Sequence, residues 1–360
     1  MASISTLVRQ QMPSYLVPFF YLSYPTVPPS VLDSFPHSSY YGTGPLDACL
    51  IVTIIAVMAI LRDAFRLGLF EPFAHSLLSR RLESRRQQKL DSKLNGHHKI
   101  NGNGNGHAVE NPNLQKEVRQ IHRSVLRFAE QGWSFVYYTT QWSYGWYVNR
   151  NLPTRLFDPT DLWLNYPHIP LAGPLKFFYL TQTAFYLHQI LIINAEARRK
   201  DHVQMMTHHV ITIILMGLSY YMNFTRVGCL VMILMDWCDI FLPLAKMIRY
   251  LGISQLACDT TFAIFLVSWL ITRHVFFLFV IKSTYYDLPR VQEFIWNPEV
   301  GSYLSTSVWL GFTTLLLALQ VLQMIWFWMI CRVAWRVVIG KGATDERSDD
   351  EGDDRDDKDD

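Results

Sequence analysis

Charged residues are scarce in this chain, and their scarcity excludes an ordinary soluble protein. Only 17% of the 360 residues are Asp, Glu, Lys or Arg, against about 25% in average usage. Most of these charges cluster in 62–99, 114–130 and 345–360, which leaves long apolar stretches between them. A soluble chain of this length would spread its charges over its whole surface. We therefore expect long segments that face lipid.

Cysteines are also few, and their spacing lacks a metal-binding pattern. The five residues form no CxxC pair and lie in or beside apolar segments: Cys49, Cys229, Cys238, Cys258 and Cys331. We interpret them as small apolar packing residues. Residues 1–45 lack a basic start followed by an apolar run and a small-residue cleavage site, so we expect no cleavable signal peptide.

The net charge of +2 conceals two regions of opposite sign. Residues 345–360 hold eleven acids and three bases, a local charge of −8, so the remainder carries +10. The bases lie beside apolar runs, which is not the pattern of a protein that binds nucleic acid. They predict contact with lipid headgroups and anionic substrates.

Seven apolar stretches are long enough to approach the 20 or so residues that cross a bilayer. They are 46–62, 127–148, 175–195, 203–222, 227–246, 258–281 and 303–331. Lys and Arg are enriched in alternate loops, and the positive-inside rule then places the N-terminus in the lumen and the C-terminus in the cytosol. The predicted fold is all-α, a polytopic bundle of about seven transmembrane helices around a central cavity.

The remaining sequence divides around these spans. The predicted parts are a lumenal N-terminal segment (1–45), a first span (46–62), a basic cytosolic segment with a disordered Asn/Gly linker (63–119), a six-span domain (120–335) and an acidic disordered cytosolic tail (336–360). The linker itself, 95–113, is too polar to bury the apolar area that folding requires.

Ionisable side chains within the apolar stretches are the most informative residues. They are costly in a membrane and are functional candidates by default. The fourth stretch carries His208 and His209, and the fifth carries Asp236 and Asp239. His208 lies roughly 8 Å from the cytosolic end of its span and Asp239 roughly 10 Å from the same side, at 1.5 Å per residue. We therefore expect the two pairs to meet at similar depth.

Such a set of residues can transfer protons. A carboxylate holds a His in one tautomer and makes it a better base, while a second His can orient the substrate or form a covalent acyl-imidazole. A buried polar cluster that only joins two helices is an open alternative. So is a metal site with His202, His208, His209 and His274 as ligands, although the spans contain no HxxxH box.

Other residues in or near the spans allow less specific predictions. Arg273 and His274 lie in the sixth stretch, where Arg273 either forms an ion pair with Asp236 or lines the cavity with His274. Five tryptophans are typical of the aromatic belts at membrane interfaces: Trp142, Trp146, Trp163, Trp326 and Trp328.

Two positions match modification sequences. Asn223 begins an Asn-Phe-Thr sequon on the predicted lumenal side, so close to a span that we expect it to stay unmodified. Ser348 precedes three acids, which makes it either a site for an acidophilic kinase or part of a solvated charge run.

The segment RRKDHVQMMTHHVITIIL, followed by NFTRVGCLVMILMDWCDIFLPLAKMIRYL, resembles the longevity-assurance motif of ceramide synthases within the TLC domain. The resemblance rests on an RKD triplet, the HH pair, a D-x-x-D pair and a closing AKM-x-x-Y-L. The preceding FYLTQTAFYLHQILIINAEARRKD and the acidic tail are most similar to fungal members.

The resemblance implies transfer of a fatty acyl group from acyl-CoA to the amine of a sphingoid base, dihydrosphingosine or phytosphingosine, in sphingolipid biosynthesis at the endoplasmic reticulum membrane. It implies that His208 and His209 are essential and that Asp236 and Asp239 support them. It requires no cofactor and no metal, since the thioester is already activated. The expected partners are acyl-CoA, the sphingoid base and membrane lipid, not nucleic acid, with room for an oligomer with another ceramide synthase or a small accessory subunit.

The basic residues near the cytosolic side fit the same chemistry. CoA carries several negative charges, and a ring of bases at the mouth of the bundle would gather it by long-range attraction. The expected acyl-CoA mouth consists of Arg198, Arg199, Lys200, Lys246 and Arg249.

Two other functions compete with this interpretation. The first is a non-catalytic TLC-domain protein that binds or senses lipid, a class whose members often lack the HH and D-x-x-D pairs. The second is a transporter that couples protons through His and Asp. It would be expected to carry internal repeats, and the sequence has none.

Overall fold

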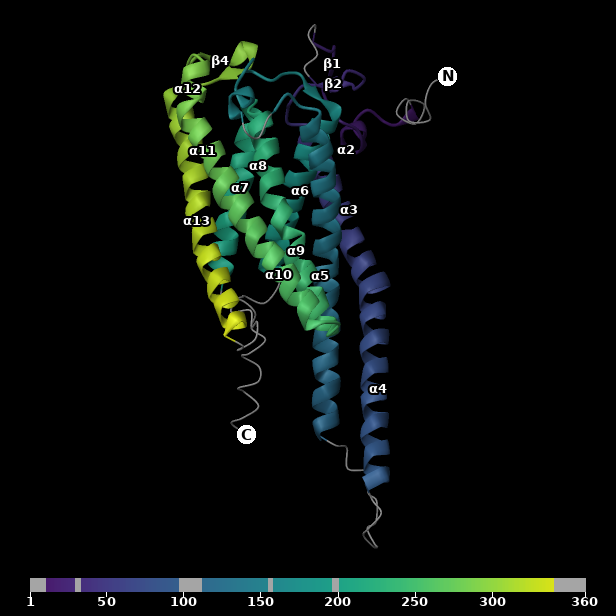
Figure 1. Cartoon of the computed structure of the whole chain (residues 1–360). Coiled ribbons are helices and arrows are strands. Elements are labelled where there is room, and N and C mark those ends of the chain that lie inside the picture. Colours follow the sequence, from purple (N-terminus) through teal and green to yellow (C-terminus); the bar gives the residue numbers. More distant parts are fainter. Residues whose placement is uncertain (1–10, 30–33, 97–111, 155–157, 196–200, 340–360) are drawn as a thin grey trace. The chain divides into compact units, whose positions relative to one another are not determined.

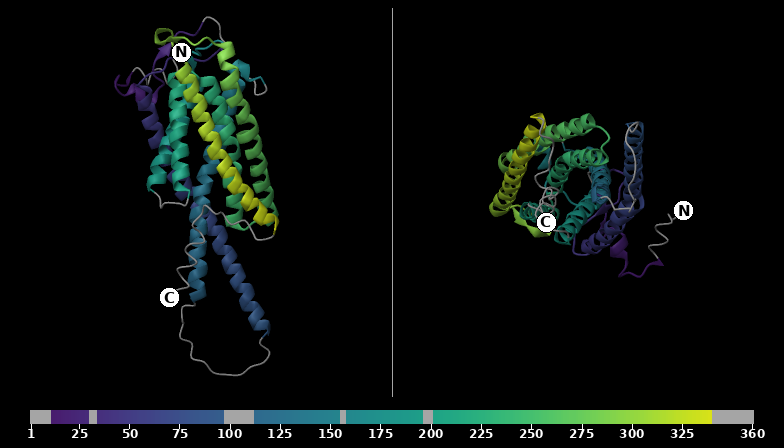
Figure 2. Two further views of the ribbon diagram at one scale, coloured as in Figure 1. Left: turned by 90° about the vertical axis from the view of Figure 1, so that its left-hand side faces the viewer. Right: turned by 90° about the horizontal axis from the view of Figure 1, so that it is seen from below.

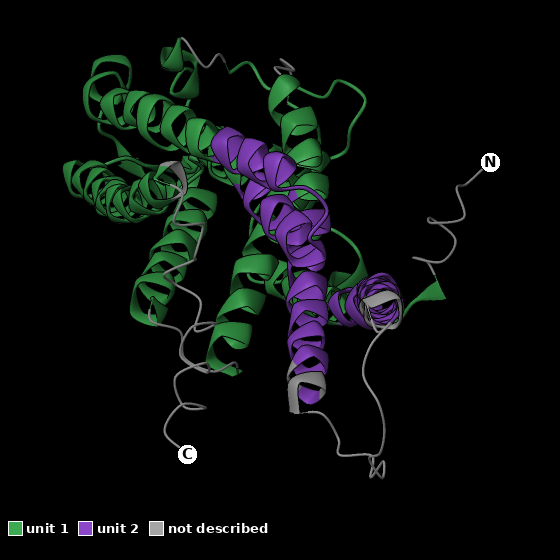
Figure 3. Cartoon of the chain, turned by 60° about the horizontal axis from the view of Figure 1, so that its bottom comes forward, with its two compact units in different colours: residues 1–59, 139–238, 266–360 green, residues 60–138, 239–265 purple. Residues whose placement is uncertain are grey.

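A computed structural model describes residues 11–29, 34–96, 112–154, 158–195 and 201–339. These residues are mostly helical (Figure 1). The chain separates into two compact units, coloured in Figure 3: unit 1 is Met1–Ala59, Thr139–Cys238 and Leu266–Asp360, and unit 2 is Ile60–Tyr138 and Asp239–Phe265.

Unit 1 holds most of the elements. They are α2 (Val17–Phe20), β1 (Pro25–Thr26), β2 (Tyr40–Tyr41), η2 (Pro159–Leu162), β3 (Leu171–Ala172), α6 (Gly173–Ala195), α7 (His202–Tyr221), η3 (Leu270–Phe276), α11 (Phe277–Tyr286), α12 (Leu288–Val291), β4 (Trp296–Asn297), η4 (Pro298–Val300), β5 (Ser302–Tyr303) and α13 (Thr306–Val338). Among the described residues, four helices run across the boundary between the units: α3 (Asp47–Phe65), α5 (Pro112–Arg150), α8 (Thr225–Asp239) and α10 (Gln255–Trp269).

In the described residues of unit 1, five very short strands accompany these helices. β1, β2 and β3 form an antiparallel sheet in which Tyr40 pairs with Ala172, and β4 pairs with β5. The first sheet joins the N-terminal segment to the residues just before α6. The expectation of a helical fold is therefore confirmed in its main feature, and the small sheets are an addition to it.

Side-chain packing holds the helices of unit 1 together. α6 packs on α7, and α13 packs on both α7 and α11 (Figure 2). Gly228 of α8 allows an especially close approach, because a Cβ there would lie 1.8 Å from the Tyr179 hydroxyl oxygen. That hydroxyl donates to the Thr225 carbonyl at 3.1 Å. Small residues at helix contacts serve this purpose in membrane proteins.

Four helical stretches in the described residues are long and apolar enough to cross a membrane. They are Asp47–Ser92, Thr225–Leu251, Gln255–Val291 and Thr306–Arg336, and they overlap the first, fifth, sixth and seventh predicted spans. The other three predicted spans fall on α5, α6 and α7, which are helical but less apolar. A membrane protein with several spans is thus confirmed, and the count of seven stays a prediction.

Within the helical stretch Thr225–Leu251, the hydrogen-bonded helix is interrupted at Ile240, whose backbone stays helical, between α8 and the next helix, α9 (Phe241–Leu251). Pro243 explains the break, since it has no N–H to bond the carbonyl of Asp239 one turn before it. α9 ends at Gly252, whose φ of +57° is the left-handed conformation that closes many helices.

Unit 2 contains η1 (Arg66–Phe70), α4 (Glu71–Gly96), α9 and parts of the helices that cross the boundary. Ala74, Val125, Phe128 and Leu251 form its buried cluster. Arg81 of α4 donates to the carbonyls of Leu251 and Gly252 and so caps α9. The predicted basic segment is therefore largely helical, while 97–111 of the predicted linker lie outside the described residues.

Candidate active site

The histidine pair lies on α7 and is buried within unit 1. His208 is 9% exposed and His209 5%, and their ring centroids are 5.4 Å apart. The Tyr186 ring lies 5.4 Å from that of His209, and the Trp326 ring lies 5.2 Å from that of His208. Both Nδ1 atoms are buried without a hydrogen-bond partner among the described residues. Neither imidazole is therefore committed to a structural hydrogen bond through Nδ1 within that part of the chain.

Asp236 and the histidine pair both contact side chains of α6. Gln182 and Tyr186 lie one turn apart on that helix, so their side chains share a face. The Gln182 amide donates to Asp236 Oδ2, while Tyr186 packs against both imidazoles. Asp236 is only 1% exposed. Asp236 and the two histidines thus contact side chains on one face of α6, while the predicted meeting of the His pair with both acids stays a prediction.

Several predicted site residues are not placed in this group. Asp239 is the last residue of α8 and belongs to unit 2, as do Lys246 and Arg249 on α9. Arg198, Arg199 and Lys200 lie outside the described residues, and so does Ser348. The supporting role of Asp239, the basic mouth and the phosphorylation site stay predictions.

Two tryptophan rings lie between Arg273 and His208. It lies in the π-helix η3, where it donates to the Met235 carbonyl at 2.6 Å and to Gln323 at 3.2 Å. Its guanidinium lies 4.0 Å from the centre of the Trp269 ring, and the Trp269 and Trp326 rings are 6.5 Å apart. Arg273 therefore packs on Trp269, whose ring neighbours the Trp326 ring that contacts His208. Its ion pair with Asp236 stays a prediction.

His274 points to a different set of partners. Its Nδ1 lies 2.7 Å from Gln320 Nε2, and its ring packs 4.8 Å from that of Phe327. No group of three or more His, Cys, Asp or Glu side chains in the described residues is arranged to hold a metal ion. His202, His208, His209 and His274 are therefore not gathered as ligands.

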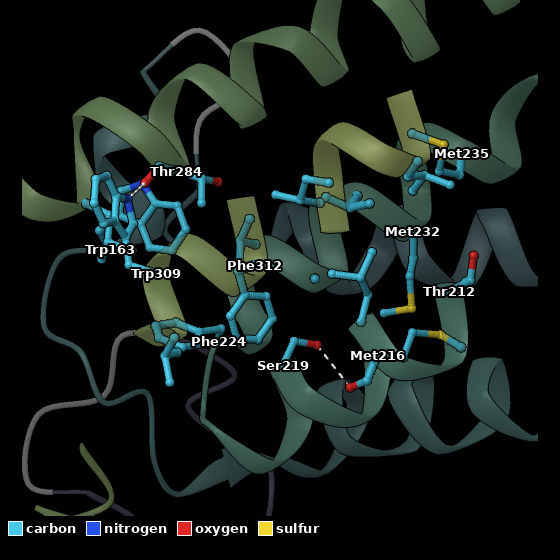
Figure 4. Close-up of a pocket in the computed structure, with 18 of the residues that line it drawn as sticks. Trp163, Thr212, Met216, Ser219, Phe224, Met232, Met235, Thr284, Trp309 and Phe312 are labelled. Carbon is cyan, nitrogen blue, oxygen red and sulfur yellow. Dashed lines mark hydrogen bonds between the residues drawn. The ribbon is translucent and has the colours of Figure 1, made fainter. Parts of the chain in front are cut away.

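An apolar pocket begins at the histidine pair. Figure 4 shows Met235, Met232 and Thr212 toward one end and Trp163, Trp309 and Thr284 at the other. The lining residues are Trp163, Tyr186, His208, Thr212, Leu215, Met216, Ser219, Phe224, Val227, Gly228, Val231, Met232, Met235, Thr284, Leu288, Val308, Trp309, Phe312, Leu316 and Leu319. His208 lines this pocket, whereas His209 is not among its lining residues.

Two of the five tryptophans are not interface residues. Trp163 is 2% and Trp326 3% exposed, and the Trp163 indole donates to Ser283 at 2.8 Å. The belt interpretation is wrong for these two because their rings fill the interior of unit 1. Trp146 and Trp328, at 50% and 59% exposed, do lie on the surface.

Asn223 of the sequon is buried at the end of α7. It is 3% exposed, has a φ of +62° and donates to the Gly301 carbonyl at 2.8 Å. Thr225, the third residue of the sequon, has no exposed surface. A glycan has no access to this amide, which supports the expectation that the sequon stays unmodified.

The sequence interpretation missed Gln182, Tyr186, Thr212 and Trp326. Gln182 had a usable signal, because a polar side chain in an apolar helix needs a buried partner. Tyr, Thr and Trp residues are common in membrane helices, so only the contacts of the other three in the structure distinguish them.

Comparison with known proteins places this site in a family. The family model of the TLC domain, which covers the TRAM, LAG1 and CLN8 proteins, matches residues 127–332. The fold and the buried site thus belong to a TLC-domain membrane protein.

The similar curated proteins narrow the class. Ceramide synthase FUM18 of Gibberella moniliformis is 33% identical over 89% of this chain and 71% of its own length. Sphingosine N-acyltransferase lag1 of Schizosaccharomyces pombe is 33% identical over 97% of this chain and 76% of its own length. Ceramide synthase 5 of Mus musculus is 35% identical over 63% and 52%. The chain belongs to the ceramide synthase family, also called sphingosine N-acyltransferases.

Proposed function

We propose that this chain is a ceramide synthase that transfers a fatty acyl group from acyl-CoA to the amine of a sphingoid base. The observation that carries the proposal is the position of His208 at the end of an apolar pocket, beside His209 and linked through α6 to Asp236. Family membership supports the substrate class.

The pocket suits the acyl chain of the donor. Most of its lining side chains are Leu, Val, Met and Phe, and its lining residues on α7 run from His208 to Ser219. Eleven residues of helix correspond to roughly 16 Å. The carbonyl carbon would lie at His208, and the hydrocarbon would extend toward Trp163 and Trp309.

The reaction requires one proton to move. The amine nitrogen attacks the thioester carbonyl carbon, the carbon–sulfur bond breaks, and the amine proton is removed. His208 accepts that proton as a general base and returns it to the departing CoA thiolate. Asp236 stabilises the imidazolium in the interval, an interaction that strengthens in a site from which water is excluded.

A covalent route uses the same residues. An unprotonated imidazole nitrogen can itself attack the thioester, which releases CoA and leaves an acyl-imidazole for the amine to cleave. A burst of one CoA per protein without sphingoid base would favour the covalent route. Its absence would favour the general-base route.

The membrane arrangement forms part of the proposal. Seven spans would surround a central cavity in the endoplasmic reticulum membrane, with the N-terminus lumenal and the C-terminus cytosolic. Acyl-CoA would then arrive from the cytosol at Arg198, Arg199, Lys200, Lys246 and Arg249. The positive-inside distribution of Lys and Arg supports this orientation.

N-acylation by the purified full chain tests the function. Given acyl-CoA and dihydrosphingosine, the protein is expected to produce the amide and free CoA in equal amounts, measured by mass spectrometry and a thiol assay. Binding of both lipids without amide formation would contradict the proposal and would instead fit a non-catalytic lipid-binding protein.

A further inference from the structure

Thr212 is the residue in the pocket whose chemistry the structure leaves unexplained. It lies one turn after His208 on α7, and both line the pocket. Its hydroxyl oxygen is buried and has no hydrogen-bond partner among the described residues. A buried hydroxyl without a partner costs about 1–3 kcal/mol. The Thr139 and Thr225 hydroxyls of unit 1 also lack a partner among the described residues, but of these three only Thr212 lines the pocket.

Other threonines in unit 1 show what Thr212 would ordinarily do. A Thr within a helix usually donates to the carbonyl four residues earlier. Thr181, Thr183, Thr272, Thr284 and Thr313 all make this bond, at 2.8–2.9 Å. Thr212 does not make it to the carbonyl of His208. Its side chain is drawn near Met232 and Met235 in Figure 4.

Apart from His208, three polar groups that line the pocket are already engaged in hydrogen bonds. The Ser219 hydroxyl donates to the Met216 carbonyl at 3.0 Å, and Thr284 donates to the carbonyl of Val280 at 2.9 Å. The Trp309 indole donates to the Thr284 carbonyl at 2.9 Å. Thr212 therefore offers an uncommitted hydroxyl next to His208, in a wall that is otherwise nearly apolar.

We propose that the Thr212 hydroxyl binds the carbonyl oxygen of the acyl thioester and stabilises the negative charge that this oxygen gains during transfer. The inference rests on the proposed function. An acyl chain in an apolar pocket has a single polar group, the carbonyl at its thioester end, and that end lies at His208. Side chains one turn apart are about 5–6 Å apart at Cβ, which allows the carbonyl carbon to face His208 while its oxygen accepts from Thr212.

The charge change favours the transition state over the bound substrate. The thioester oxygen is a weak acceptor, whereas the oxygen of the tetrahedral intermediate carries a full negative charge. A hydrogen bond to that oxygen in a dry site strengthens as the reaction proceeds. Loss of the hydroxyl should therefore lower kcat more than it raises KM.

Three variants of the full chain test the inference in the N-acylation assay. Thr212→Val removes the hydroxyl and keeps the branched shape, Thr212→Ser keeps the hydroxyl, and Thr261→Val is the control. Thr261 is a half-buried helical threonine of unit 2 that bonds the Ala257 carbonyl at 2.8 Å. We expect kcat/KM to fall about 100-fold in Thr212→Val, with most activity kept in Thr212→Ser and in the control.

The thermal midpoint separates a substrate contact from a structural one. Thr212→Val breaks no internal hydrogen bond, so its midpoint should equal or exceed that of the wild type, in contrast to Thr261→Val. Wild-type kcat/KM in Thr212→Val, or a loss of rate that follows a loss of stability, would overturn the inference. An inactive wild-type protein would instead refute the proposed function on which it rests.

Discussion

At the scale of single residues, the site consists of buried polar groups. Gln182 is completely buried and Asp236 is 1% exposed, and the Gln182 amide donates to Asp236 Oδ2. A buried polar group that loses its partner costs more than the hydrogen bond contributes. A substitution that tests the catalytic role of the Asp236 charge must therefore remove that charge and keep the hydrogen bond from Gln182.

Asp236→Asn makes this separation. The Asn side-chain oxygen still accepts from Gln182, so we expect the thermal midpoint to change little, while the rate of N-acylation falls about 100-fold because the imidazolium loses its carboxylate. Asp259→Asn is the matched control, since Asp259 accepts from Gln255 at 2.7 Å in unit 2. A wild-type rate in Asp236→Asn would contradict the assigned role.

Sequence reasoning found the charged members of the site and missed the neutral ones. His208, His209 and Asp236 stand out because an ionisable group in an apolar helix needs a reason. Thr212, Tyr186 and Trp326 do not, since Thr, Tyr and Trp occur throughout membrane helices. Their importance comes from what each one touches, or fails to touch, in three dimensions.

At the scale of elements, a buried ion pair fastens α3 and the N-terminal segment to α6. Lys176 has no exposed surface and lies 2.7 Å from Asp47 Oδ1. Its ammonium also donates to the carbonyls of Ser23 and Gly42 at 2.8 and 2.7 Å, and the Tyr220 hydroxyl donates to Asp47 at 2.8 Å. The pair therefore joins segments distant in sequence at one end of unit 1.

Removal of one charge from this pair should be strongly destabilising. Lys176→Met would leave the Asp47 carboxylate buried without its cation, a loss of about 3–5 kcal/mol, measured as a lower thermal midpoint in detergent. Adding Asp47→Asn should recover part of the loss, because no buried charge then remains. Losses that simply add in the double variant would show that the two residues do not interact.

Helix positions were predictable from hydrophobic runs, whereas their interruptions were not. All seven predicted spans fall on helices of the structure. The break at Ile240 was missed although Pro243 indicated it, since the run of apolar residues continues through it. The paired short strands were missed because a two-residue strand is too short to show a hydrophobic periodicity. It forms only where a partner strand lies beside it.

At the scale of the whole molecule, composition was the decisive information. A chain that gathers its charges in three regions and leaves apolar runs between them is a membrane protein, and the family match agrees. Two of the three less apolar predicted spans carry polar groups of the site: Gln182 on α6 and the histidines on α7. Such helices survive in a membrane by packing their polar side inward.

The central claim is that His208 performs the acyl transfer. The most direct measurement is the rate of N-acylation of dihydrosphingosine by purified His208→Ala, compared with the wild type and with His75→Ala, an exposed histidine of α4. We expect His208→Ala to lose at least about 100-fold in rate while its thermal midpoint shows that it is folded, and His75→Ala to match the wild type. A folded His208→Ala protein with the wild-type rate would contradict the account.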